Sequence, residues 1–326
     1  MRQLSLGIDV AKETLDVVLL DRDVSHYQQV PNTPAGHAQL AQWLQRKAQG
    51  ERVHACLEAT GQYGDGIATY LCELGHPVSV VNPARIKAYA ASRLRRFKHD
   101  KGDAELIATY CQREQPELWT PPGESFSELR AMTRHLEDLK KMRQQESNRL
   151  KSGMTSPRVL AALQEHLAFL DAQIKELSDD IDRHSNEDRE LKAQKDLLTS
   201  IPGIGSLTAA KLLSEVRDFG AFLNAPQLAA YAGLVPEQYR SGTSVWSKAR
   251  LSRKGNAHLR KALYMPALVA LRHNPLIVAL KARMEKTGHR PMEIVGAAMR
   301  KLLHLAYGVI KTGKPFDPNH AQTATG

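Results

Sequence analysis

A long and almost glycine-free stretch, from residue 126 to about residue 198, constrains the fold of this chain more than any other feature. It contains one glycine, Gly153, and a Ser156-Pro157 break. After the break, apolar residues recur at alternating intervals of three and four, which is the heptad pattern of packed helices: Leu160, Leu163, Leu167, Leu170, Ile174, Leu177 and Ile181. The pattern predicts two long helices that either fold back on each other or form a coiled coil with a second chain. A role in dimerisation is a hypothesis.

Composition places the chain among ordinary globular proteins. Its 326 residues are 42% hydrophobic and 25% charged, enough for two or three domains with cores. Cys56, Cys72 and Cys111 are odd in number and show no CxxC spacing, which favours buried thiols over disulfides or a zinc site. We expect a cytoplasmic protein without a membrane partner, because no apolar run has transmembrane length and no secretory signal begins the chain.

The region before the long helices has the pattern of an α/β domain. Apolar alternation predicts strands near residues 4–9, 15–20 and 26–30, and two further strands near 52–58 and 78–81. Thr33-Pro34 is an N-cap followed by proline, which predicts a helix between the third and fourth strands. The order βββ-α-β-α-β predicts a mixed sheet.

Four acidic residues occupy positions where they can converge. Asp9 and Glu58 end or interrupt predicted strands, while Asp100 and Asp103 lie three residues apart in the first turn of a predicted helix. Close carboxylates need a cation to offset their repulsion, and hard oxygen ligands suit Mg²⁺ or Mn²⁺. The alternative is a set of unrelated surface acids, since acids favour the first turn of any helix.

The motifs around these acids resemble those of the DEDD transposases. They are GIDVAK at 7–12, CLEATG at 56–61, VNP at 81–83 and KHDKGDA at 98–104. The resemblance implies an N-terminal RuvC-like domain of the RNase H fold. It also implies that the catalytic, metal-binding acids of the family correspond to Asp9, Glu58, Asp100 and Asp103.

The positive charge of the chain is concentrated in its last quarter. Residues 238–326 carry 16 Lys/Arg against 3 Asp/Glu, whereas residues 1–237 carry 29 against 32. Such one-sided charge is typical of a nucleic-acid partner. The densest part, residues 240–261, predicts nucleic-acid contacts by seven cations: Arg240, Lys248, Arg250, Arg253, Lys254, Arg260 and Lys261.

The segment 200–211, SIPGIGSLTAAK, has the pattern of a helix-hairpin-helix. In that motif a turn such as Gly203–Gly205 brings backbone N–H groups to a DNA phosphate at a helix N-terminus. The alternative is a tight turn between packed helices.

Ser241 lies in the basic stretch, between Arg240 and Gly242. On its own, a Ser-Gly in a basic loop is most simply a phosphate-binding or structural turn. The resemblance to the DEDD transposases continues here, through GLVPEQYRSGTSV at 233–245 and LSRKGNAHLRKALYMPA at 251–267. It implies a serine transposase domain in which Ser241 is the catalytic serine.

Four segments are predicted: a RuvC-like domain at 1–124, a helical spacer at 125–198, a mainly helical serine transposase domain at 199–314, and a tail at 315–326. The resemblance implies a recombinase that cuts and rejoins DNA through a serine–DNA bond, with Mg²⁺ or Mn²⁺ at the acids. It also implies a structured guide RNA, the bridge RNA of related recombinases, and a homodimer or tetramer. No GxxxxGK[ST] loop occurs, so we expect no nucleotide cofactor.

Three other functions compete with this interpretation. A site-specific DNA invertase of the same family would share every residue named above. A structure-selective nuclease would use only the carboxylates, and Ser241 would then have no catalytic part. A non-catalytic nucleic-acid-binding protein would use only the charge.

Overall fold

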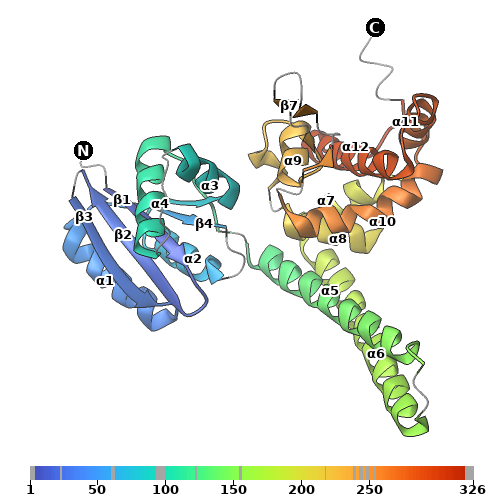
Figure 1. The fold of residues 1–326 in the computed structure, drawn as a ribbon, viewed down its shortest axis with the longest axis horizontal. Coiled ribbons are helices and arrows are strands. Elements are labelled where there is room, and N and C mark those ends of the chain that lie inside the picture. Colours follow the sequence, from blue (N-terminus) through green and yellow to red (C-terminus); the bar gives the residue numbers. More distant parts are fainter. Residues whose placement is uncertain are drawn as a thin grey trace. The chain divides into compact units, whose positions relative to one another are not determined.

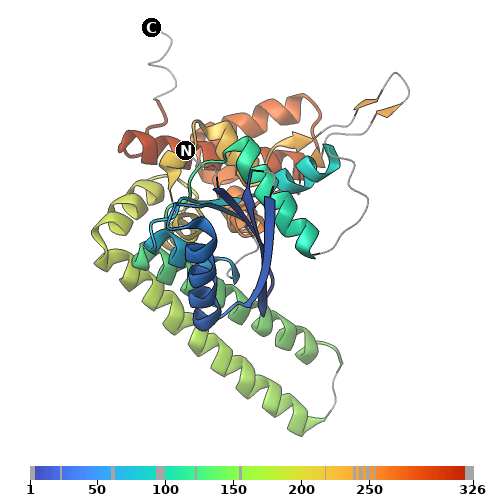
Figure 2. The ribbon, with the colours of Figure 1, turned by 90° about the vertical axis from the view of Figure 1, so that its left-hand side faces the viewer.

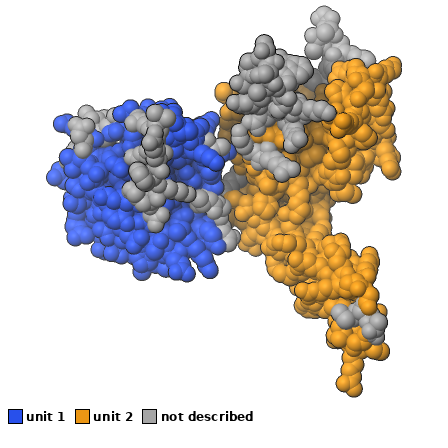
Figure 3. Space-filling model, viewed as in Figure 1, with its two compact units in different colours: residues 1–121 blue, residues 122–326 orange. Residues whose placement is uncertain are grey.

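The computed structural model describes residues 4–22, 24–59, 63–92, 100–121, 123–153, 156–216, 218–237, 240–241, 245–246, 250–252 and 255–319. The chain divides into two compact units, residues 1–121 and residues 122–326 (Figure 3). Each unit has its own hydrophobic core and is described separately.

Unit 1 is a five-stranded mixed sheet with helices on both faces (Figure 1). The strand order is β3-β2-β1-β4-β5, with β1 antiparallel to β2 and parallel to β4. This confirms the predicted mixed sheet and its order of elements. The elements are β1 Leu4–Val10, β2 Thr14–Asp21, β3 Val24–Pro31, α1 Pro34–Ala48, β4 His54–Glu58, α2 Asp65–Glu73, β5 Val78–Val81, α3 Pro83–Ser92 and α4 Asp100–Glu114.

The alternation along β1 divides the core of unit 1 between the two faces of the sheet. Leu4, Leu6 and Ile8 face α1 and α2, where they join the main core of the unit. Ser5, Gly7 and Asp9 therefore lie on the opposite face, which α4 covers. The helix α1 begins as predicted, because Thr33 caps it by accepting a hydrogen bond from the Gly36 N–H and Pro34 follows in the first turn.

Unit 2 is mainly helical, and its core lies among α7, α8, α10 and α12. Its helices are α5 Glu124–Leu150, α6 Pro157–Glu187, α7 Arg189–Thr199, α8 Ser206–Glu215, η2 Phe219–Ala221, α9 Ala225–Tyr231, α10 Ala257–His273, α11 Pro275–Lys286 and α12 Pro291–Thr312. Four strands of two residues each accompany them: β6 Pro236–Glu237, β7 Arg240–Ser241, β8 Val245–Trp246 and β9 Arg250–Leu251.

The long helices α5 and α6 pack against each other as a hairpin within one chain (Figures 1 and 2). Arg143 of α5 forms an ion pair with Asp171 of α6, and Glu146 lies 3.6 Å from His166. From the first pair to the second, the residue number rises along α5 and falls along α6, so the two helices are antiparallel. The fold-back predicted as one of two alternatives is therefore present, and pairing with a second chain stays a hypothesis.

Candidate active site

Asp9 and Glu58 occupy neighbouring positions at the same end of the sheet. Strands β1 and β4 are parallel, and Ile8 pairs with Leu57, so the next residue on each strand is one of the two acids. Both acids are half-buried. The carboxyl ends of adjacent parallel strands thus bring two carboxylates to one edge, as predicted from their positions in the sequence.

The helix α4 lies directly on β1 because residue 7 is glycine. A Cβ at Gly7 would stand 2.0 Å from the carbonyl oxygen of Ala104 and 2.2 Å from the backbone nitrogen of Ala108. Farther along the helix, the Sγ of Cys111 is 3.4 Å from the carbonyl oxygen of His54, at the start of β4. The helix therefore runs antiparallel to β1 and β4, and its N-terminus lies toward the carboxyl ends of those strands.

The first turn of α4, which carries Asp100 and Asp103, therefore lies toward the end of the sheet that carries Asp9 and Glu58. Asp103 is half-buried, and Asp100 is described by its backbone alone. Among the side chains that the structure describes, no three His, Cys, Asp or Glu residues are grouped closely enough to hold a metal ion. The donor types, all carboxylates, fit a hard divalent cation such as Mg²⁺ or Mn²⁺.

A fifth carboxylate, Asp16, was not among the predicted site residues. It lies in β2 directly opposite Asp9 and is only 4% exposed. Tyr27 and Gln29, both on β3, donate hydrogen bonds to it. The sequence does show Asp16 as a single acid inside the apolar run of residues 15–20. That it lies opposite Asp9, however, follows only from the register of the two strands.

The thiols of Cys56 in β4 and Cys111 in α4 are buried in one hydrophobic cluster, and all three cysteines of the chain are free. A hydrogen bond to Cys111 raises the pKa of the Cys56 thiol, and burial raises it further. A thiol held protonated in this way is a packing group rather than a nucleophile.

Ser241 belongs to a two-stranded sheet of unit 2, formed by β7 and β8. It is the last residue of β7, and it pairs with Val245 of β8. Strands β6 and β9 pair on either side of this segment along the chain, with Pro236 opposite Leu251. The backbone of Ser241 is described as part of this strand pair; the Ser241 side chain lies outside what the structure describes.

The chain beyond β9 is anchored to the helical core at two consecutive residues. Gly255 has φ +143°, and a Cβ there would stand 2.5 Å from the carbonyl oxygen of Tyr231. Asn256 caps α10 by accepting from the Leu259 N–H at 2.9 Å, and its amide donates to Glu215 at 2.7 Å. These contacts fix where the basic segment enters α10.

The seven predicted nucleic-acid cations fall into three groups. Lys248, Arg253 and Lys254 lie outside the described residues, and Arg240 and Arg250 are described only by their backbone in β7 and β9. Arg260 is half-buried and donates to the carbonyl oxygen of Ala232 at 3.1 Å, which gives it a structural role. Lys261 has a side chain that is 67% exposed.

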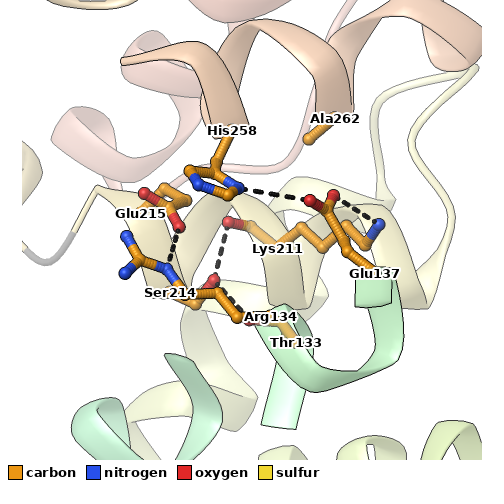
Figure 4. Close-up of a pocket in the computed structure, with 8 residues that line it drawn as sticks. All are labelled: Thr133, Arg134, Glu137, Lys211, Ser214, Glu215, His258 and Ala262. Atoms are coloured by element: carbon orange, nitrogen blue, oxygen red, sulfur yellow. Dashed lines mark hydrogen bonds and ion pairs between the residues drawn. The ribbon is translucent and has the colours of Figure 1, made fainter. Parts of the chain in front are cut away.

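A polar cluster lies where α5, α8 and α10 meet, and it lines a small pocket (Figure 4). Glu137 of α5 is 3.1 Å from the Lys211 ammonium, 3.2 Å from Nδ1 of His258 and 3.5 Å from Lys261. Burial acts to raise the pKa of Glu137, but the charge of Lys211 and the hydrogen bonds from Lys211 and His258 outweigh it and hold that pKa below its ordinary value. The cluster therefore ties the first turn of α10 to the helical core.

The predicted helix-hairpin-helix corresponds to α7, the turn at 200–205 and α8. Its two glycines have different surroundings. Gly203 has φ +106°, and a Cβ there would stand 2.8 Å from the Cβ of Ala270, so this glycine is needed for packing on α10. Gly205 caps α8, is exposed and has open space around it, so the phosphate contact predicted for the turn rests on Gly205.

A carboxylate lies at the N-terminus of α8. The hydroxyl of Ser206, the first residue of α8, donates to Asp182 of α6, and the buried ammonium of Lys195 is 2.6 Å from the same carboxylate. The hydrogen bonds from Lys195 and Ser206 lower the pKa of Asp182. An anion that approaches Gly205 would therefore meet this negative charge nearby.

Two family models match the chain: one described as a transposase, over residues 6–157, and one described as transposase IS116/IS110/IS902 family, over residues 195–282. A pilin gene-inverting protein of Moraxella lacunata is 34% identical over 319 residues, which cover 97% of this chain and 98% of the relative. The chain belongs to the IS116/IS110/IS902 transposase family.

Other proteins share less sequence identity with this transposase. The transposase for insertion sequence element IS1328 of Yersinia enterocolitica is 26% identical over 281 residues, 77% of this chain and 81% of the relative. T. thermophilus RuvC in complex with Holliday junction substrate is 16% identical, covers 36% of this chain and 99% of that chain, and has a TM-score of 0.28, too low to carry an argument.

None of the described helices of this transposase combines the length and the apolarity that crossing a membrane requires. The helices α10 and α11 reach both only as a pair, across a bend of 87°.

Proposed function

We propose that this transposase cuts and rejoins DNA through a covalent bond between Ser241 and a DNA phosphate, with the carboxylates Asp9, Glu58, Asp100 and Asp103 binding Mg²⁺ or Mn²⁺. The observation that carries the proposal is the direction of α4. Because that helix runs antiparallel to β1 and β4, its first turn, with Asp100 and Asp103, lies toward the end of the sheet that carries Asp9 and Glu58, and this supports the proposal. Unrelated surface acids would have no reason to share one end.

The first chemical step breaks one bond and forms another. The Oγ of Ser241 attacks the phosphorus of a phosphodiester, so an O–P bond forms while the bond from phosphorus to the leaving DNA oxygen breaks. The serine proton passes to a base, and the leaving oxygen acquires a proton to become a hydroxyl. Rejoining is the reverse step with a hydroxyl from another strand, and it needs no ATP because the phosphoserine ester retains the energy of the broken bond.

A divalent cation, when bound, would neutralise phosphate charge and assist deprotonation of a hydroxyl. The residues that would hold it are Asp9, Glu58, Asp100 and Asp103. Ser241 lies in the other unit of the chain, so catalysis requires the two units, of one copy or of two, to approach the same phosphate. A homodimer or tetramer would supply the several active sites that strand exchange between duplexes requires.

The basic segment 240–261 would bind the nucleic acids through their phosphates. DNA is the substrate, and we propose a structured guide RNA from the mobile element as a second nucleic-acid partner. Lys261 has a side chain that is 67% exposed, with its ammonium 3.5 Å from Glu137, whereas Arg260 donates to the carbonyl oxygen of Ala232. Phosphate contacts of this kind do not distinguish RNA from DNA.

Site-specific inversion is the second candidate function. It is favoured by the 34% identical relative over nearly the full length, which is named a pilin gene-inverting protein. Inversion and transposition use the same cutting and rejoining chemistry, so they differ in the arrangement of the DNA sites rather than in the residues proposed here. A structure-selective nuclease that uses the carboxylates alone is the third.

The proposal is tested by looking for the covalent bond. Full-length wild type, Ser241→Ala and the control Ser247→Ala are each incubated with labelled element-end DNA, Mg²⁺ and RNA transcribed from the flank of the element, then denatured. We expect DNA attached to the wild type and to Ser247→Ala, and none attached to Ser241→Ala. Metal-dependent cleavage by Ser241→Ala without any adduct in the wild type would instead establish the nuclease.

A further inference from the structure

Asp16 is a buried carboxylate in an unusual place. It is 4% exposed, and it pairs directly with Asp9 across the antiparallel strands β1 and β2. Side chains that are directly opposite in such a pair lie on the same face of the sheet, with Cβ atoms about 5 Å apart. Asp16 therefore lies on the face covered by α4, beside an acid of the proposed metal site.

Two neutral donors hold the Asp16 carboxylate. The hydroxyl of Tyr27 donates to Oδ1 at 2.5 Å, and the amide of Gln29 donates to Oδ1 at 3.1 Å and to Oδ2 at 3.3 Å. Both donors come from β3, the strand on the far side of Asp16 from Asp9. They fix the orientation of the carboxylate.

No cation of the described part of the chain forms an ion pair with Asp16. Of the side chains around it, Lys101 of α4 has its ammonium 5.6 Å from the centre of the Tyr27 ring, so it contacts the donor rather than the acceptor. A buried carboxylate with no counterion costs folding free energy, and a like charge directly opposite adds to that cost. A cation bound beside Asp9 would offset both costs.

We propose that Asp16 is a positioning residue for the metal site, a fixed negative charge beside Asp9 that raises the affinity of the site for a divalent cation. Tyr27 and Gln29 hold that charge in place from β3. The proposal rests on the metal site of the proposed function, and it extends the set of acids from four to five without making Asp16 a direct ligand.

The test measures Mn²⁺ binding directly, by electron paramagnetic resonance of the free ion, on the full-length protein. Asp16→Asn removes the charge and keeps the shape, and we expect it to weaken Mn²⁺ binding about tenfold, the scale of groups that act through a metal ligand. Tyr27→Phe should weaken it by a smaller factor. Asp21→Asn, the same charge change at the opposite end of β2, is the matched control and should leave binding within about twofold of the wild type.

A melting temperature measured without metal separates positioning from simple structural support. Because Asp16→Asn removes a charge repulsion, it should melt at or above the temperature of the wild type. If Asp9→Asn abolishes Mn²⁺ binding while Asp16→Asn and Tyr27→Phe both bind as tightly as the wild type, the role of Asp16 is wrong and the metal site stands. If the wild type binds no Mn²⁺, the metal site and the role of Asp16 are both wrong.

Discussion

Replacing Gly7 by alanine tests the packing on which the proposed site depends. The added Cβ would stand 2.0 Å from the carbonyl oxygen of Ala104 and 2.2 Å from the nitrogen of Ala108. Both atoms belong to the backbone of α4 and cannot rotate away. The helix must therefore shift by at least about 1 Å to restore even a close contact of about 3 Å.

The expected cost follows from this overpacking. Crowding one methyl group into a packed interior lowers the free energy of unfolding by about 1–3 kcal/mol. Each kcal/mol corresponds to roughly 4 °C, so the melting temperature of unit 1 should fall by roughly 4–12 °C. The shift also moves the first turn of α4, which carries Asp100 and Asp103, away from Asp9. Mn²⁺ affinity should fall together with stability.

The assays are calorimetry and Mn²⁺ titration of the full chain, with Gly308→Ala as the control. A Cβ at Gly308, inside α12, meets no atom within 4 Å, so alanine there should raise the stability of unit 2 by about 0.5–1 kcal/mol. If Gly7→Ala melted like the wild type and bound Mn²⁺ with unchanged affinity, the close approach of α4 to β1 would be refuted, and with it the convergence of the acids.

Two further predictions concern charged groups of unit 2. Asp182→Asn leaves the buried ammonium of Lys195 without its anionic partner, so urea unfolding should show a loss of about 1–3 kcal/mol in the free energy of unfolding. The control Asp196→Asn, in an exposed ion pair, should change that free energy by less than about 0.5 kcal/mol. Equal losses in the two variants would contradict the prediction. Glu137→Gln should cost about 1–3 kcal/mol at pH 7 by removing the charge that Lys211 contacts. Because the pKa of Glu137 lies below its ordinary value of 4.5, its stabilisation is complete above pH 4.5 and is lost as the pH falls through the lowered pKa. Urea midpoints of wild type and Glu137→Gln should therefore converge as the pH is lowered below 4.5, and a gap that stayed constant would be the contrary result.

Local patterns in the sequence were sufficient for the five strands and for the helices α1, α2 and α4 of unit 1, whereas α3 was not predicted. The Thr33-Pro34 cap and the strand periodicity each depend on neighbouring residues, and both were confirmed. The positions of Asp9 and Glu58 were predicted for the same reason, because each stands at or next to the end of its own strand, and their part in a metal site stays a prediction.

Long-range packing was beyond the reach of those patterns. The position of Asp16 opposite Asp9 is a matter of strand register, and the direction of α4 depends on contacts such as Cys111 with His54, 57 residues apart. The two glycines of the turn at 200–205 look alike in sequence, yet one packs on α10 and the other is exposed. Such differences arise only when distant segments meet.

The segment that contains Ser241 is held to the rest of unit 2 at its two ends, so its length can change without disturbing the helical core. Pairing of β6 with β9 holds both ends of the segment between residues 237 and 250, and Gly255 locks the exit against Tyr231. Closing a longer loop between fixed ends costs only about 0.6 kcal/mol for each doubling of its length. Insertions or deletions in this segment would therefore change how far Ser241 reaches while leaving the helical core intact. The span between the proposed nucleophile and DNA can thus be re-engineered independently of fold stability.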